Sequence, residues 1–145
     1  MPAFRFSLEK VRSYRQAVED KLKQELAAAL RQRAREEALL AEIAREQSAR
    51  QSQKHTGRLN ISEAVQASLY LDYLAARRQL QEERVNALVE QVEKQKERVR
   101  EAMRERKVMD RLRQRRLEAY RYLQGREEQK EVDEVAVSGY IRKQH

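Results

Sequence analysis

Residues 71–102 read LDYLAARRQLQEERVNALVEQVEKQKERVREA. Seven apolar side chains in this stretch fall on one register of alternating three- and four-residue steps, although polar residues fill some positions of that register: Leu71, Leu74, Val85, Leu88, Val92, Val99 and Ala102. This is the heptad repeat of a coiled coil, in which one seam of a helix faces a partner helix. The charged residues between them are typical of a solvated face with ion pairs one turn apart. The stretch therefore predicts a long helix that packs against a second one.

The same heptad register extends in both directions. Ala67 precedes the stretch and Met109 follows it. Polar side chains occupy several positions of the register: Arg78, Gln81, Gln95 and Arg106. Such interruptions lower the stability of a coiled coil and help to fix its register.

The bounds of this helix follow from capping residues. Asn60 and Glu63 resemble a capping box, which predicts that the helix begins at about residue 61. We expect it to run over about 61–137, with a frayed tail over 138–145. Gly125 is unfavourable inside a helix and makes a kink there plausible.

A first helix is predicted over about 7–54. Ser7 can cap its first amides, and Gly57 marks a turn at about 55–60. Its apolar side chains repeat at an average nearer 3.6 than 3.5 residues, which predicts a straight or weakly supercoiled helix. They are Leu8, Val11, Val18, Leu22, Leu26, Ala29, Leu40 and Ala44.

Composition supports an all-α fold with one hairpin. The 145 residues include three glycines, one proline and 39% charged side chains, so there are few turns and too little apolar surface for an ordinary globule. We predict a single coiled-coil domain over 1–145, in which two long helices form an antiparallel hairpin. The second helix is longer, so about 110–137 should overhang without a partner.

The sequence offers no catalytic, cofactor or metal site. It contains no cysteine and two histidines, His55 and His145, neither of which has a carboxylate or second histidine at a useful spacing. There is also no phosphate-binding glycine loop. No apolar run is long enough for a membrane span or a signal peptide. We therefore expect a cytoplasmic, non-enzymatic protein.

Positive charge is concentrated late in the chain. Residues 104–126 carry nine basic and three acidic side chains, and the net charge of the whole chain is +8. An acidic partner is one interpretation, and a solvated face without a partner is another. Nucleic acid is a third, although Tyr120 and Tyr122 are the only nearby aromatic residues and no base-reading motif is present. The candidate residues are Arg111, Arg113, Arg115 and Arg116.

A second candidate surface lies near the predicted turn. Four side chains at helical spacing share a face distinct from the apolar seam: Gln66, Tyr70, Tyr73 and Arg77. Leu40 and Ile43 should lie at the same height on the first helix, so this patch could anchor a partner. Alternatively, the tyrosines only cover the seam and keep their hydroxyl groups in water.

Three stretches of the chain resemble a known family. They are FRFSLEKVRSYRQAVEDKLKQELAAAL at 4–30, YLDYL at 70–74, and the region from RERKVMDRLRQRRLEAY at 104–120 to EEQKEVDEVA at 127–136. The most specific part is Glu128–Ala136, which is similar to the ending E-Q-K-x-hydrophobic-D-E-hydrophobic-A of the flagellar type III export protein FliJ family. The resemblance covers nearly the whole chain.

The resemblance implies a fold and a set of partners. FliJ proteins are antiparallel coiled coils similar to the central stalk of rotary ATPases. They are cytoplasmic and associate peripherally with the inner-membrane export apparatus. The implied partners are the hexameric export ATPase (FliI-like), the export gate membrane protein (FlhA-like) and export chaperones.

The resemblance also implies binding residues. The surface for the export gate would comprise Leu40, Ile43, Tyr70, Tyr73, Leu74 and Arg77. The end that binds the ATPase ring would include Phe4–Val11 and the overhang Arg111–Ala136, with Phe4, Phe6, Arg111, Arg113, Arg115 and Arg116 as candidates for the ring or another acidic partner. A stalk protein of a related injectisome and a coiled coil that binds nucleic acid remain alternatives.

Overall fold

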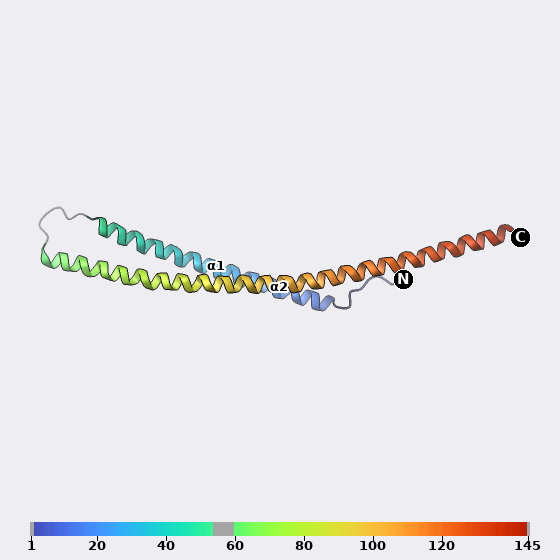
Figure 1. Cartoon of the computed structure of the whole chain (residues 1–145), viewed down its shortest axis with the longest axis horizontal. Coiled ribbons are helices and arrows are strands. Elements are labelled where there is room, and N and C mark those ends of the chain that lie inside the picture. Colours follow the sequence, from blue (N-terminus) through green and yellow to red (C-terminus); the bar gives the residue numbers. More distant parts are fainter. Residues whose placement is uncertain (1, 54–59, 145) are drawn as a thin grey trace. The chain divides into compact units, whose positions relative to one another are not determined.

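The structure, a computed structural model, describes residues 2–53 and 60–144. It contains two helices, α1 (Glu9–Ser52) and α2 (Ile61–Gln144), and the described residues include no strand (Figure 1). The all-α prediction, with a longer second helix, is confirmed. The predicted turn lies outside the described residues except for Asn60.

Asn60 caps the first residues of α2, which confirms its predicted part in a capping box. The amide of Ser62 donates a hydrogen bond to Asn60 Oδ1 (3.2 Å), and the amide of Ala64 donates to the Asn60 carbonyl (3.1 Å). The side chain of Asn60 thereby satisfies an amide that has no partner inside the helix. Glu63 lies in the first turn, where a negative charge is favourable.

The first helix begins two residues later than predicted. The Glu9 amide donates to the Phe6 carbonyl (3.1 Å), and α1 starts at Glu9. Ser7 does not hold the cap position that the sequence suggested, because α1 starts two residues after it. Its hydroxyl accepts a hydrogen bond from Arg116 instead.

Contacts divide the chain into two compact units. We call residues 1–19 with 101–145 the terminal unit and residues 20–100 the turn unit. In each unit, residues later in α1 contact residues earlier in α2, so the two helices run antiparallel. Side-chain bonds show this for Arg12 with Asp110 and Arg15 with Glu105 in the terminal unit, and for Glu36 with Gln81 and Glu46 with Tyr70 in the turn unit. The antiparallel hairpin is thus confirmed, whereas a single domain remains a prediction.

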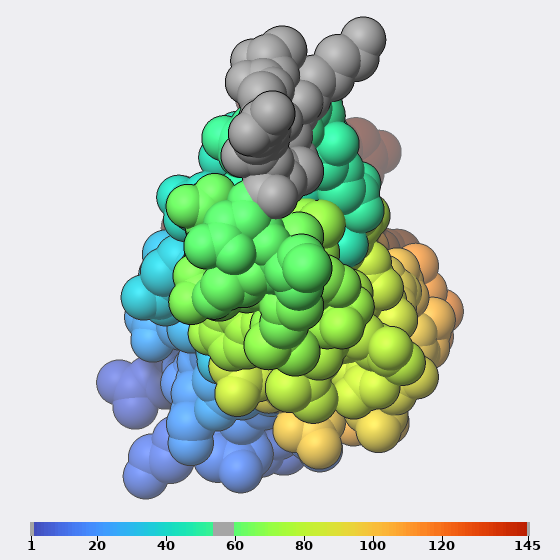
Figure 2. All heavy atoms as spheres, turned by 90° about the vertical axis from the view of Figure 1, so that its left-hand side faces the viewer, coloured from blue at the N-terminus to red at the C-terminus, as the bar shows by residue number. Residues whose placement is uncertain are grey.

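The core of the turn unit combines the predicted heptad seam of α2 with residues of α1. Its buried hydrophobic residues are Ala29, Ile43, Leu74, Val85, Val92 and Val99, and Gln81 is buried among them. Gln81 Nε2 donates to the carbonyl of Glu36 (3.0 Å) and to its carboxylate. Figure 2 shows the first turns of α2 (green) against the last turns of α1 (teal).

The predicted apolar stripe of the first helix is buried or partly buried at seven of its eight positions, but polar residues also face the seam. Val11 is 41% exposed, whereas Arg12 and Arg15 are partly buried. Buried and partly buried residues recur at alternating steps of four and three: Leu8, Arg12, Arg15, Glu19, Leu22, Leu26, Ala29, Arg33, Glu36, Leu40, Ile43 and Gln47. Polar side chains therefore occupy positions along the seam that the predicted apolar stripe did not include, while the predicted 3.6-residue period stays a prediction.

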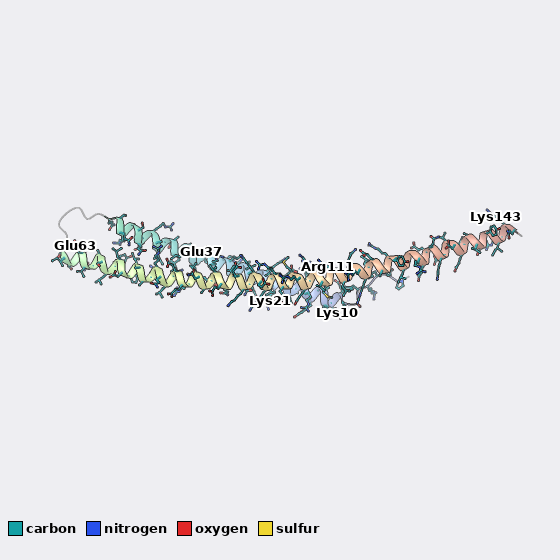
Figure 3. All side chains as sticks on the ribbon, viewed as in Figure 1. Lys10, Lys21, Glu37, Glu63, Arg111 and Lys143 are labelled. Atoms are coloured by element: carbon teal, nitrogen blue, oxygen red, sulfur yellow. The ribbon has the colours of Figure 1, made fainter. Side chains whose placement is uncertain are left out.

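In the last part of α2, the start of the overhang and the end of the helix both differ from their predicted positions. The overhang begins later than residue 110, because the N-terminal segment packs on α2 as far as Tyr120. Residues 125–144 are all exposed, and Figure 3 shows no second helix beside the turns around Lys143. The helix continues to Gln144, so the predicted end at 137 was wrong.

Gly125 lies inside α2 and supports a prediction about local stability. A Cβ atom placed on it would meet nothing within 4 Å. Gly125→Ala should therefore stabilise the surrounding helical turns by about 1 kcal/mol, because alanine loses less backbone entropy. Hydrogen exchange of the amides around residue 125 should slow about five-fold. Unchanged or faster exchange would contradict this prediction.

Candidate partner-binding surfaces

The N-terminal segment packs along α2 through two phenylalanines. Phe6 is only 8% exposed. The ring of Phe4 lies 5.6 Å from that of Tyr120, with the planes tilted by 52°. The Arg113 guanidinium lies over the Phe4 ring, 5.9 Å from its centroid. Aromatic and cation–π contacts of this kind hold a segment that has no secondary structure of its own.

Polar contacts fix the same segment. Arg116 lies over the ring of Phe6 (5.4 Å), and its Nη1 donates to Ser7 Oγ (2.6 Å). The Tyr120 hydroxyl donates to the carbonyl of Pro2. The sequence predicted no partner within the chain for Arg113 and Arg116. In the structure, the N-terminal segment of the chain contacts both of them.

The predicted arginine cluster is split between two faces of α2. Arg111 and Arg115 are exposed and, among the described residues, have neither an ion-pair nor a hydrogen-bond partner. Arg113 lies on the other side, with Nε 3.9 Å from a carboxylate oxygen of Glu9. The structure groups Phe4 and Phe6 with Arg113 and Arg116 only.

A polar layer, comprising Arg12, Glu19, Arg106 and Asp110, occupies the seam of the terminal unit. Glu19 is fully buried, and Arg106 Nε donates to its carboxylate. Asp110 accepts one bond from Arg106 Nη1 (2.7 Å) and another from Arg12 Nε (2.8 Å). The Arg12 hydrogen bond is the main reason why the pKa of Asp110 lies below its usual range, and Arg106 adds to the effect.

The lowered pKa of Asp110 predicts a loss of stability in acid. A carboxyl whose pKa is lower in the folded chain contributes stability at pH values above its unfolded pKa of about 3.9. That contribution should disappear as the pH falls through the lower pKa of the folded state. Asp110→Asn should thus reduce the acid sensitivity of the thermal midpoint below about pH 4. Equal pH dependence of the two proteins would contradict the prediction.

The candidate gate surface in the turn unit divides by burial. Ile43 and Leu74 fill the seam and are 2% and 0% exposed, so almost none of their surface is accessible in the paired hairpin. Leu40 and Tyr70 are partly buried, while Tyr73 and Arg77 are exposed.

Tyr70 is held in a small aromatic cluster. Its hydroxyl donates to the Glu46 carboxylate, and this bond is the main cause of a raised Tyr70 pKa. The Arg50 guanidinium lies 4.7 Å from the ring centroid, and the ring of Tyr73 lies 6.0 Å away. The cluster fixes Tyr70 and presents Tyr73, which is 56% exposed, to solvent.

An exposed apolar stripe, comprising Ile61, Val65, Leu69 and Tyr73, was missed from the sequence except for its last member. These residues recur every four positions, and each is more than half exposed. Leu80 is exposed further along α2. Their spacing was visible in the sequence, because they lie outside the seam register of Ala67, Leu71 and Leu74. Adjacent exposed apolar residues are typical of an interaction site.

The described residues contain neither a membrane-spanning segment nor a group of metal ligands. Neither α1 nor α2 contains a segment with the length and hydropathy of a membrane span. Within residues 2–53 and 60–144, no three histidine, cysteine or acidic side chains are grouped as metal ligands.

The chain is similar to a known protein family. The model of a family described as "Flagellar FliJ protein" matches residues 4–145. No curated protein and no solved structure matches the chain.

Proposed function

Because the chain belongs to the FliJ family of flagellar export proteins, we propose that it is an adaptor that binds the export ATPase and the export gate. Members of the family are non-enzymatic export components. The observation that carries the proposal is the family match over essentially the whole chain. An antiparallel hairpin with one helix longer than the other supports it, because a stalk of this form can enter a ring.

We assign ATPase binding to the terminal unit. Its α2 segment is exposed on every side over residues 125–144, so a ring could surround it. Phe4 and Phe6, with Arg113 and Arg116, form the nearest structured surface. Positive charge on this end would accelerate docking and fix its orientation more than it would raise affinity.

Mixing the purified chain with its cognate export ATPase tests the assignment. We expect faster ATP hydrolysis and more hexamer at a given ATPase concentration. Phe4→Ser with Phe6→Ser should weaken both effects, while Ile61→Ser with Val65→Ser, which lie in the turn unit, should leave them intact. No change in either readout with the unmodified chain would refute ATPase binding.

We assign gate binding to the turn unit. Tyr73 and Arg77 would contact the gate directly, and Leu40 and Tyr70 would contribute their accessible edges. Ile43 and Leu74 would act from beneath, because they hold the two helices together. The exposed apolar stripe extends this surface, since aromatic and aliphatic anchors supply most of the energy of protein interfaces.

Export chaperones and location complete the proposal. Binding of chaperones rests on family membership, as does a cytoplasmic location with peripheral association at the inner-membrane export apparatus. The family match favours the flagellar system over a related injectisome.

A further inference from the structure

A line of cations follows the outer face of α2 in the terminal unit. This basic stripe comprises Arg104, Lys107, Arg111 and Arg115, which recur at steps of three and four residues. The buried and seam-facing residues of the same segment, Ala102, Arg106 and Asp110, lie on the other side of the helix. All four stripe residues are exposed, and Figure 3 labels Arg111 among them.

The charge of the stripe is largely uncompensated. Within the described chain, Lys107, Arg111 and Arg115 have no hydrogen-bond or ion-pair partner. A carboxylate continues the line at each end, Glu101 before Arg104 and Glu118 after Arg115. Glu118 accepts a hydrogen bond from Gln114 (3.2 Å). Holding like charges together without partners costs free energy, and an anionic partner would offset this cost.

Two exposed apolar side chains accompany the cations. Val108 and Tyr122 are 60% and 65% exposed on the same side of α2. The Arg126 guanidinium lies 6.0 Å from the centroid of the Tyr122 ring. Tyrosine and the long stems of basic residues favour the boundary between an apolar layer and water.

We propose that the basic stripe binds the surface of an anionic phospholipid bilayer, with α2 lying along the headgroups. This function is additional to the proposed binding of the ATPase and the gate. At about 1.5 Å per residue, the stripe and Tyr122 extend for about 27 Å along one helix face. Lipids diffuse laterally, so each cation can recruit a headgroup without a fixed pattern of complementary charges.

The geometry favours this partner over nucleic acid and over a protein. The phosphates of a duplex follow a curved path, so a straight helix on its surface would contact them over only part of that length. A specific protein partner would need apolar anchors in a pocket, and the stripe offers two separate apolar side chains on a convex helix.

Flotation of the full chain with vesicles tests the proposal. We expect it to float with vesicles of phosphatidylcholine and phosphatidylglycerol at low salt, and not with phosphatidylcholine alone. Release is expected in about 1 M NaCl, where the Debye length is about 3 Å. The triple variant Lys107→Gln, Arg111→Gln and Arg115→Gln should reduce vesicle binding about a hundred-fold, or about five-fold for each cation.

A matched variant separates the stripe from overall charge. Lys10→Gln, Lys21→Gln and Arg35→Gln remove the same charge from exposed positions of α1, two of which Figure 3 labels. This control should retain most of the binding. The proposal is overturned by no binding to anionic vesicles, by equal losses in the two variants, or by tighter stripe-dependent binding to duplex DNA. Circular dichroism should show unchanged helicity in both variants.

Discussion

Replacing Arg106 alone with leucine is expected to lower the free energy of unfolding by about 3–5 kcal/mol. Glu19 is fully buried, and Arg106 donates a hydrogen bond to its carboxylate. Removal of this cation breaks a buried ion pair and leaves the negative charge of Glu19 buried, which is among the most destabilising changes that a single substitution can cause. Urea denaturation followed by circular dichroism at 222 nm measures the change.

The double variant distinguishes an uncompensated charge from lost packing. Glu19→Leu with Arg106→Leu places two leucines at seam positions, where apolar residues stabilise a coiled coil. Replacing a buried ion pair by apolar residues is often neutral or stabilising, so we expect the double variant to be at least as stable as the original chain. A double variant as unstable as Arg106→Leu alone would contradict this explanation.

Leu74→Ala is expected to cost about 2–5 kcal/mol of unfolding free energy. Leu74 is completely buried in the seam of the turn unit, and truncation there removes apolar contacts and leaves a cavity. Its neighbour Tyr73 is 56% exposed, so Tyr73→Ser should cost less than about 1 kcal/mol. The comparison uses thermal or urea unfolding of the two variants.

This pair of variants separates folding from binding at adjacent positions. Equal stability losses would contradict the burial of Leu74 and the exposure of Tyr73. Gate binding and unfolding of Leu74→Ala should therefore be measured under the same conditions. A loss of gate binding is attributed to the folded state only where that measurement shows the variant to be folded.

The sequence was sufficient for the fold class and for the seam of α2. Val85, Val92 and Val99 repeat at seven residues, and Asn60 marks the start of the helix, so local rules were enough. The seam of α1 was predicted only in part, because Arg12 and Glu19 also occupy it. A prediction from apolar residues alone misses seam positions that carry polar side chains, because such side chains form their hydrogen bonds with the other helix.

The candidate surfaces were only partly predictable. Phe4 and Phe6 were candidates from the sequence, but they precede α1 and have no helical period. The packing of Phe4 against Tyr120 and of Arg116 over Phe6 therefore required the structure. The tyrosine patch was found from helical spacing. Ile61 and Leu69 were missed because the prediction followed the apolar residues of the seam register, and these two residues lie outside that register.

If the seam side chains are buried between α1 and α2, partners must bind the outer faces of the hairpin. The most direct measurement is the affinity of Leu69→Ser with Tyr73→Ser for the soluble part of the cognate export gate, with Val132→Ser and Val135→Ser as the control. Both pairs are exposed apolar residues of α2. We predict an affinity loss of about thirty-fold or more for the first pair, none for the control, and unchanged helicity in both. Full affinity in the first pair, or an equal loss in the control, would contradict the assignment of binding to this outer face.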